Sequence, residues 1–298
     1  MPACPAGGLL IKTEASGLCS GELMAWYMDQ KAPHVLGHEV AGKVVESQDD
    51  RFAVGARVAP HHHAPCLKCD FCLAKQFVHC ALWKSTKLEP GGMAEYFTIS
   101  PDLLLDCHLA NDLEACDAAL VEPVACVMKS RRRARWRPTD RTAVIGLGVM
   151  GLIHLLSCPG AIGFERNPAR AARGISLGFE VRSDESGAGE FDLIFMCPGS
   201  QDVLDLALTL AAPGARILQF APMPGAHLDL NAIYFRDLEL IQSYSCGPDD
   251  TTQAIREIRL TQVIAKDVVS DFIKLSDLPQ AYQDMKAGKI LKPMVIFD

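Results

Sequence analysis

The sequence lacks the segments that would carry it into or across a membrane. No apolar run reaches the roughly 18–20 residues that a membrane-spanning helix requires. The N-terminal stretch MPACPAGGLLIK has no charged region followed by a long apolar core, so we expect no secretory signal peptide. Internal repeats and low-complexity segments are absent too. We therefore expect a globular protein of the cytoplasm.

Positive charge is not in excess either. The chain carries 29 Lys and Arg residues against 36 Asp and Glu residues, a net charge of −7. This balance argues against nucleic acid or an anionic membrane surface as the main partner. One basic run, KSRRRARWR at 129–137, is predicted to be the solvated face of a helix rather than a phosphate site.

The length and the cysteine content favour two domains and a bound metal. A chain of 298 residues, 49% of them hydrophobic, is long enough for two domains and can bury a core without disulfides. Twelve cysteines in a cytoplasmic protein indicate metal binding more often than disulfide bonds, because thiols stay reduced there.

The pattern of apolar residues changes near residue 113. Residues 35–60 and 92–107 alternate as short strands do, whereas residues 113–136 have helical spacing. From residue 141 onward, short apolar strands alternate with helical segments, as βαβ units with a parallel sheet do. The expected strands of this part are 141–148, 161–165, 191–199 and 215–222.

The C-terminal tail returns to a mixed pattern. TTQAIREI and SDLPQAYQDMKAG are predicted to be helical, and KPMVIFD is predicted to be a closing strand. The expected fold class is therefore α/β, with a β-rich N-terminal part, a doubly wound parallel-sheet unit and a tail that rejoins the first part.

Four cysteines form the strongest local motif of the chain. Their spacing is C-x2-C-x2-C-x7-C, at Cys66, Cys69, Cys72 and Cys80. Such gaps let four thiolates complete a tetrahedron around zinc, with no position left for a substrate. A ferredoxin run would have three residues before its last cysteine, and a metal-free or redox cluster is the weaker alternative. We expect a structural zinc, with the histidines at 61–63 as polar loop or strand residues rather than ligands.

A dinucleotide-binding fingerprint lies between an expected strand and an expected helix. Gly146, Gly148 and Gly151 form G-x-G-x-x-G, with Val149 and Met150 opening the helix. The glycines allow a tight turn and a close approach of the backbone to a pyrophosphate. The alternative is that they serve packing only.

Glu165 ends the next expected strand, where an acidic residue would bind the ribose hydroxyls. Its carboxylate favours NAD, because it would repel the 2′-phosphate of NADP. Arg166 and Arg170 follow closely enough to leave NADP possible.

A second, fainter set of metal ligands is scattered along the chain. Cys19 lies in GLCSGEL, His38 and Glu39 are adjacent in VLGHE, and Glu122 lies in LVEPVAC. These residue types are suitable zinc ligands, and three of them would leave one coordination position open. Spacing alone does not group them.

The order of the motifs supplies that grouping. GLCSGEL, VLGHEVAG, CLKCDFCLAKQFVHC, GGMAEYF, VEPVACV, VIGLGVMG and YFRDLELIQSYS together resemble the zinc-dependent medium-chain alcohol dehydrogenase superfamily, along nearly the whole chain. The sorbitol and threonine dehydrogenase-like branch is the most similar, because a Glu stands in the VEP segment.

The resemblance implies a fold and an organisation into two domains. It implies a GroES-like, β-rich catalytic domain at 1–130 and 247–298, which holds both zincs, and a Rossmann NAD(P)-binding domain at 131–246. Members of this superfamily are commonly dimers or tetramers, so a homo-oligomer is expected.

The resemblance also assigns the catalytic zinc and its chemistry. Cys19, His38 and Glu122 are implied as ligands or near-ligands, and Glu39 as a ligand or a neighbour of one. The implied reaction moves a hydride between a secondary alcohol (a polyol, a sugar derivative or an amino alcohol) and NAD(P). Trp26 and Tyr27 would line the substrate pocket or simply pack in the core.

The chain departs from the family pattern in several places. The hydroxyl residue expected two positions after the zinc cysteine is replaced by Gly21, so Ser20 or water would carry the proton. The GDRV motif has Ala56 in place of its Asp. The N-terminus and some connections are shorter than usual. These departures motivate a rival hypothesis, a degenerate paralogue that binds zinc and nucleotide without turnover; a zinc-free quinone-reductase-like relative is a third.

Overall fold

The computed structural model describes residues 1–183 and 186–298. The chain divides into two compact units, residues 1–125 with 246–298 and residues 126–245. The sequence predicted boundaries at 130/131 and 246/247, and the structure sets them at 125/126 and 245/246. Helix α5 (Val121–Arg133) therefore begins in the first unit and continues in the second.

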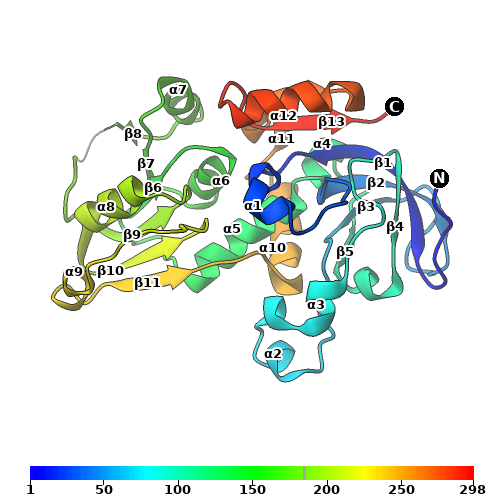
Figure 1. The fold of residues 1–298 in the computed structure, drawn as a ribbon, viewed down its shortest axis with the longest axis horizontal. Helices are drawn as coiled ribbons and strands as arrows, with labels where there is room; N and C mark the ends of the chain where they lie inside the picture. The colour runs from blue at the N-terminus through cyan, green and yellow to red at the C-terminus, as the bar shows by residue number, and fades with distance from the viewer. Residues whose placement is uncertain (184–185) are drawn as a thin grey trace. The chain divides into compact units, whose positions relative to one another are not determined.

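The first unit is built on a seven-stranded sheet within the described residues, ordered β12-β13-β1-β2-β3-β5, with β4 paired to β1. The N-terminal and C-terminal strands are neighbours, because β13 pairs antiparallel with β1 (Figure 1). The strands are β1 (Leu9–Gly17), β2 (Glu39–Ser47), β3 (Arg57–Pro60), β4 (Tyr96–Ile99), β5 (Cys107–Leu109), β12 (Asp271–Ile273) and β13 (Pro293–Ile296).

Short helices connect these strands. They are η1 (Ser20–Leu23), α1 (Ala25–Met28), α2 (Asp70–Leu73), η2 (Phe77–His79), α3 (Ala81–Ser85), η3 (Pro101–Asp106), α4 (Ala115–Ala118), α10 (Pro248–Arg259), α11 (Ala265–Val268), η4 (Leu275–Asp277) and α12 (Leu278–Lys286). Apolar side chains such as Leu9, Ile11 and Phe97 are fully buried in one core on this sheet.

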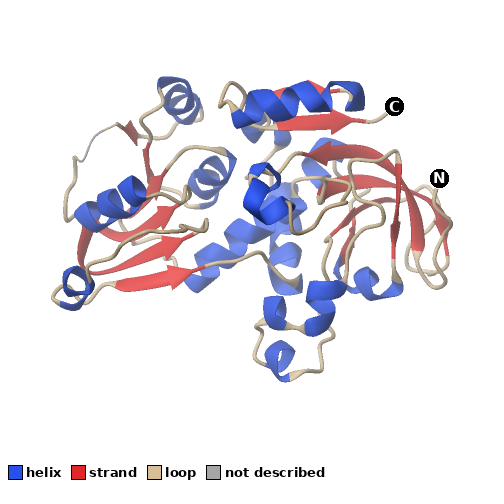
Figure 2. Ribbon diagram, in the orientation of Figure 1, coloured by secondary structure: helices blue, strands red, loops and turns tan. Residues whose placement is uncertain are grey.

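The second unit is a six-stranded, all-parallel sheet in the part of the chain that the structure describes, with helices alongside its strands (Figure 2). Its order, β11-β10-β9-β6-β7-β8, is that of a Rossmann fold. The strands are β6 (Thr142–Ile145), β7 (Ile162–Phe164), β8 (Val181–Arg182), β9 (Phe191–Met196), β10 (Ala211–Gln219) and β11 (Glu239–Gln242). The helices are α6 (Val149–Ser157), α7 (Pro168–Ser176), α8 (Gln201–Leu210) and α9 (Leu230–Tyr234).

The α/β fold class and the parallel sheet expected from the sequence are confirmed. One expected helix differs from the prediction, at a proline. The helix expected over 113–136 is divided into α4 and α5; Pro123 has no N–H and therefore fits the first turn of α5 but not a helix interior. The short strands expected over 92–107 are found as β4 and β5, with η3 between them, which Pro101 opens.

The basic run at 129–137 anchors the edge strand β11 within the second unit. The ammonium of Lys129 donates to the carbonyl of Tyr244 at 2.6 Å, and Arg135 forms an ion pair with Glu239 at 2.6 Å. Arg131 lies over the ring of Trp136, 4.6 Å from its centroid. None of the helices in residues 1–183 and 186–298 has the length and apolar character needed to cross a bilayer.

Candidate functional site

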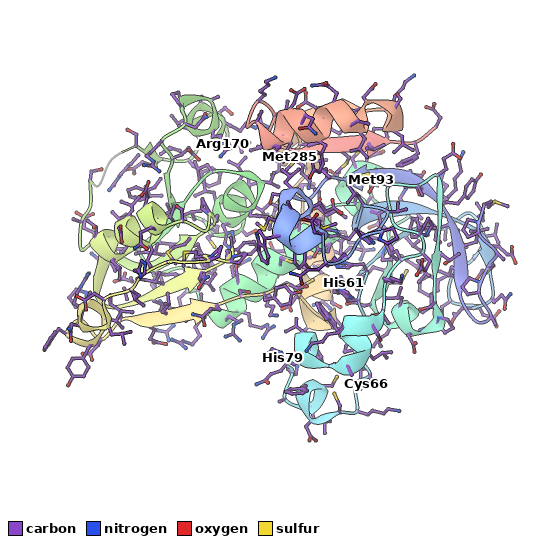
Figure 3. The ribbon with its side chains drawn as sticks, in the orientation of Figure 1. His61, Cys66, His79, Met93, Arg170 and Met285 are labelled. Carbon is purple, nitrogen blue, oxygen red and sulfur yellow. The ribbon has the colours of Figure 1, made fainter. Side chains whose placement is uncertain are left out.

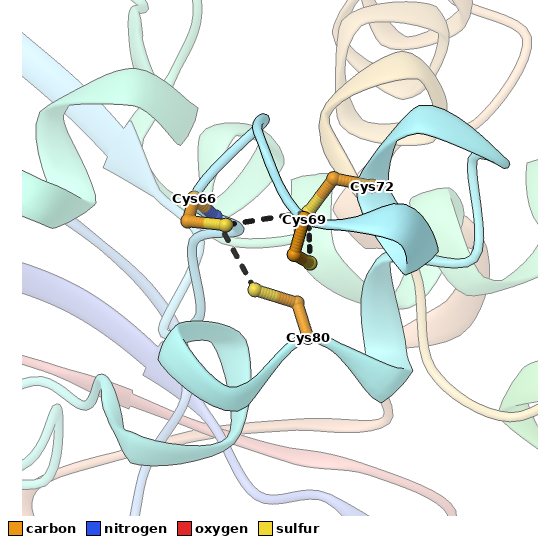
Figure 4. A group of neighbouring side chains, drawn as sticks. All are labelled: Cys66, Cys69, Cys72 and Cys80. Carbon is orange, nitrogen blue, oxygen red and sulfur yellow. Dashed lines mark hydrogen bonds between the residues drawn. The ribbon is translucent and has the colours of Figure 1, made fainter.

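The four cysteines of the C-x2-C-x2-C-x7-C motif converge in one loop of the first unit (Figure 4). The Sγ atoms of Cys69 and Cys72 are 3.5 Å apart, and those of Cys66 and Cys72 are 3.9 Å apart. Two thiolates bound to one tetrahedral zinc at about 2.3 Å lie about 3.8 Å apart. The spacing therefore fits a zinc tetrathiolate, whereas a disulfide would need about 2.05 Å.

The backbone of this loop is arranged to hold the thiolates in place. Leu67 adopts the left-handed conformation, with φ of 59°, which turns the chain between the first two cysteines. The amide of Cys66 donates to the Sγ of Cys80 at 3.4 Å. The apolar side chains of Phe77, Val78 and Trp83 pack against the cluster. Four protein ligands leave no position for a substrate, which makes this a structural site.

A second group of potential ligands forms where β1 ends and β2 begins. Cys19 follows β1, His38 precedes β2, and Glu39 is its first residue. One ligand atom from each lies within 4.8 Å of the others. The strands pair antiparallel with Gly17 opposite Glu39, and this register brings the sequence-distant Cys19 and Glu39 together. A thiolate, an imidazole and a carboxylate suit zinc and leave a fourth position open.

Glu22 orients this group, a role that sequence reasoning missed. Its Oε1 lies 3.2 Å from Nδ1 of His38 and accepts from the amide of Gly37 at 2.7 Å. Its Oε2 accepts from the amide of Cys19 at 3.2 Å. With the proton on Nδ1, Nε2 of His38 keeps its lone pair for a metal. Glu22 is three residues after Cys19 in a capping box, a signal that could have found it.

In this group, burial and the neighbouring charges shift the pKa values in opposite directions. Burial raises the pKa of Glu22, but the positive charge that His38 carries when it is protonated and the hydrogen bonds from His38, Gly37 and Cys19 outweigh it and lower that pKa overall. Burial raises the pKa of the Cys19 thiol, and the adjacent His38 opposes this effect. Glu22 is thereby held as a carboxylate.

Glu39 is also paired, with a lysine from the far end of the chain. The ammonium of Lys292 contacts its Oε2 and lies 3.4 Å from the carbonyl oxygen of Leu18. Glu39 and Lys292 are 2% and 1% exposed, so this is a fully buried ion pair. The sequence carried no sign of it, because the two residues are 253 positions apart.

The glycine fingerprint of the second unit forms a turn between β6 and α6. Gly146 has φ of 84°, in the left-handed region that favours glycine. A Cβ on Gly151 would overlap the carbonyl oxygen of Gly146, so this residue allows close packing of the helix. A Cβ on Gly148 would meet nothing within 4 Å. The space beside Gly148, at the N-terminus of α6, is therefore open, as the expected pyrophosphate position of this motif requires.

Glu165 lies over the same turn. Its Oε2 accepts from the amide of Leu147 at 2.8 Å, and its Oε1 from that of Asn167 at 2.8 Å. Arg166 is exposed and lies 3.4 Å from the carboxylate of Asp202. Arg170 lies in the first turn of α7 (Figure 3). The carboxylate thus sits at the carboxyl end of β7, beside the glycine turn.

Comparison with known proteins agrees with this geometry. Residues 5–108 match the family model of the alcohol dehydrogenase GroES-like domain. "Probable D-xylulose reductase A" of Arthroderma otae is 24% identical, over 97% of this chain and 90% of that protein. D-altritol 5-dehydrogenase of Agrobacterium fabrum is 29% identical, over 92% of this chain and 87% of that protein. The chain is thus similar, over nearly its whole length, to sugar and polyol oxidoreductases, and its N-terminal part matches a GroES-like domain.

A solved structure shows the same fold from end to end. Galactitol-1-phosphate dehydrogenase from Escherichia coli superposes with a TM-score of 0.86 at 20% identity, over 100% of this chain and 96% of that one. The GroES-like and Rossmann assignments are confirmed. The relatives are named as reductases and dehydrogenases of sugars and polyols, which favours a working oxidoreductase over a degenerate paralogue.

Not every residue that the superfamily motif suggested lies with the catalytic zinc group. Glu122 is grouped in the described structure with His61 and Cys246, and not with Cys19. Ser20 is exposed at the start of η1. Trp26 is 54% exposed, so it does not pack in the core. The remaining set of Cys19, His38 and Glu39 stands as the candidate catalytic centre.

Proposed function

We propose that this protein is a medium-chain dehydrogenase that oxidises a secondary alcohol of a polyol or sugar derivative with NAD(P), using Cys19, His38 and Glu39 as ligands of a catalytic zinc. The proposal rests on this three-residue set, in which the carboxylate of Glu22 orients the ring of His38. The cysteine loop, with four protein ligands, is closed to a substrate, whereas the three ligands of the Cys19 set leave one position open.

Zinc in this set would lower the pKa of the alcohol, and the nicotinamide would take its hydride. The chain's own residues have separate tasks. Glu22 fixes the ring of His38, and Lys292 compensates the charge of Glu39. Ser20 is the nearest hydroxyl in sequence to Cys19 and would pass the substrate proton to solvent, since it is exposed. Glu122, which lies with His61 and Cys246, is a second choice as a ligand of the catalytic zinc.

The Rossmann unit would hold the cofactor through its glycine turn. The amides at Val149 and Met150 open α6 above the space beside Gly148, and Gly146 and Gly151 shape the turn. Glu165 would accept hydrogen bonds from the adenosine ribose, which favours NAD. Arg166 and Arg170 lie near enough in sequence to accommodate a 2′-phosphate, so NADP is tested alongside.

The substrate class, the assembly and the compartment are further parts of the proposal. The names of the relatives, a xylulose reductase and an altritol dehydrogenase, support a polyol. Strand β11 forms one edge of the Rossmann sheet, and an edge strand can pair with a second copy, which supports a homo-oligomer. No two of the twelve cysteines are joined by a disulfide, as in a reducing cytoplasm.

Oxidation of a polyol panel tests the proposal directly. Zinc-loaded protein is mixed with xylitol, sorbitol, altritol and erythritol, with NAD or NADP, and reduced cofactor is followed at 340 nm. We expect turnover of at least one polyol, and Cys19→Ala should lose one zinc ion together with the activity. Cys116→Ala, a half-buried cysteine outside the metal groups, is the matched control. Intact binding of NAD without oxidation of any secondary alcohol would contradict the proposal.

A further inference from the structure

A third group of potential metal ligands lies in the GroES-like unit. His61 follows β3, Glu122 lies in the first turn of α5, and Cys246 precedes α10. One ligand atom from each lies within 4.8 Å of the others. Their exposed fractions are 1%, 8% and 0%, so the group is buried, and Figure 3 marks the position of His61. None of the three belongs to the Cys19 set or to the cysteine loop.

His61 is oriented as metal-binding histidines usually are. Its Nδ1 lies 2.8 Å from Oδ2 of Asp106, a fully buried carboxylate. Asp106 is fixed in turn, because the hydroxyl of Thr251 donates to its Oδ1 and Nε2 of His108 lies 3.3 Å from the same atom. With the proton of His61 on Nδ1, the lone pair of Nε2 points to the side where Cys246 lies.

The separation of the nitrogen and the sulfur fits one bound ion. Nε2 of His61 is 3.4 Å from Sγ of Cys246. A tetrahedral zinc with Zn–N of about 2.05 Å and Zn–S of about 2.3 Å places these two atoms about 3.5 Å apart. The carboxylate of Glu122 is then close enough to serve as a third ligand after a small adjustment.

The same atoms could also be arranged as a nucleophilic thiol with a histidine base and an aspartate behind it. Burial argues against this alternative. The side chain of Cys246 is 0% exposed, so no substrate carbonyl reaches its sulfur. A divalent cation, by contrast, would bind the thiolate and the carboxylate together, and it needs no route for a substrate to the sulfur.

We propose that His61, Glu122 and Cys246 bind a third zinc ion in this protein. The sequence predicted the histidines at 61–63 to be polar loop or strand residues rather than ligands, because the four cysteines that follow already fill a zinc site without them. The third site is independent of the dehydrogenase proposal. It assigns Glu122 to a centre other than the Cys19 set, and it predicts about three zinc ions per chain instead of two.

Metal stoichiometry tests the inference. Protein purified with Zn²⁺ is dialysed against metal-free buffer and analysed by mass spectrometry for zinc per chain. We expect about three in the wild type and about two in Cys246→Ser and in Glu122→Gln, with unchanged circular dichroism. Cys158→Ser is the matched control, because Cys158 is also 0% exposed but lies in the Rossmann unit. It should keep all the zinc.

Cobalt gives a second readout that needs no activity. In Co²⁺-substituted protein, the thiolate-to-cobalt absorption near 350 nm should fall in Cys246→Ser and stay unchanged in Cys158→Ser. The inference is overturned if the saturated wild type holds only two metal ions, if Cys246→Ser keeps the wild-type count, or if iodoacetamide alkylates Cys246 in metal-saturated protein. Polyol oxidation measured in the same samples separates these results from a failure of the proposed function.

Discussion

The ammonium of Lys292 lies against the carboxylate of Glu39 in the interior of the GroES-like unit, with both side chains at most 2% exposed. The pair forms because Gly17 of β1 faces Glu39 on one side and Met294 of β13 on the other. It therefore ties the C-terminal strand to the candidate catalytic centre.

Removal of the lysine charge alone should lower the free energy of unfolding more than removal of both charges. Lys292→Met leaves the buried Glu39 carboxylate without its partner, and we expect a loss of about 3–5 kcal/mol in unfolding free energy. The double variant Lys292→Met/Glu39→Gln should recover more than half of that loss. Denaturant unfolding of zinc-free protein measures both, because Glu39 is also a proposed zinc ligand and its replacement would change zinc binding. A double variant as unstable as the single one would contradict this account of the pair.

Glu22 should control the affinity of the catalytic zinc. Glu22→Gln keeps the size of the side chain but weakens its hold on Nδ1 of His38. We expect zinc affinity at the Cys19 set to fall about 10–100-fold, measured by competition with a chromogenic chelator. Glu14→Gln, a carboxylate elsewhere in the same unit that pairs with Arg57, should leave this affinity unchanged. Equal effects in the two variants would exclude a specific role for Glu22.

The cysteine loop should carry stability rather than catalysis. Cys80→Ser removes one of four ligands, so we expect the loss of one zinc ion and of at least about 3 kcal/mol in unfolding free energy. The polyol KM should stay within about twofold at temperatures where the variant remains folded. A rise in KM without loss of stability would instead place this loop at the substrate.

Two glycines distinguish cofactor binding from packing. Gly148 has φ of −69° and open space beside its Cα, so Gly148→Val should change stability by less than about 0.5 kcal/mol. The same variant should weaken NAD binding at least about tenfold, because the new side chain fills the pyrophosphate space. Gly151→Ala should instead destabilise the fold, because its Cβ would overlap the backbone of Gly146. Calorimetric titration with NAD and thermal unfolding separate the two effects.

His154 should make the Rossmann unit sensitive to acid. Burial lowers the pKa of His154 to about 4, against the opposing hydrogen bond with the carbonyl of Met150. The unfolded chain takes up this proton below about pH 6.5, whereas the folded chain does so only near pH 4. Stability is therefore lost as the pH falls through this window, by about 2 kcal/mol at pH 5.

The His154→Gln variant isolates this contribution. Its loss of stability between pH 7 and pH 5 should be about 2 kcal/mol smaller than that of the wild type, measured by urea unfolding. His227→Gln, an exposed histidine of the same unit, serves as the control. Identical pH profiles of the wild type and His154→Gln would refute the assignment.

Short-range patterns allowed much of the fold to be predicted. The alternation of apolar strands and helices after residue 141 predicted the parallel sheet, because buried strands must be apolar on both faces. A helix boundary moved where a single residue acts locally, as at Pro123. Glu22 was within reach of the sequence, since it completes a capping box with Cys19.

The sequence by itself determined the two motifs whose residues lie close together along the chain. The cysteine loop and the glycine fingerprint are set by spacing, because a loop of a few residues brings its own side chains together. Only the tertiary structure decided which distant residues share a site. Strand register brings Lys292 to Glu39, and the fold of the first unit brings Glu122, at the start of α5, and Cys246, before α10, to His61. Such contacts depend on chain topology, which no local spacing encodes.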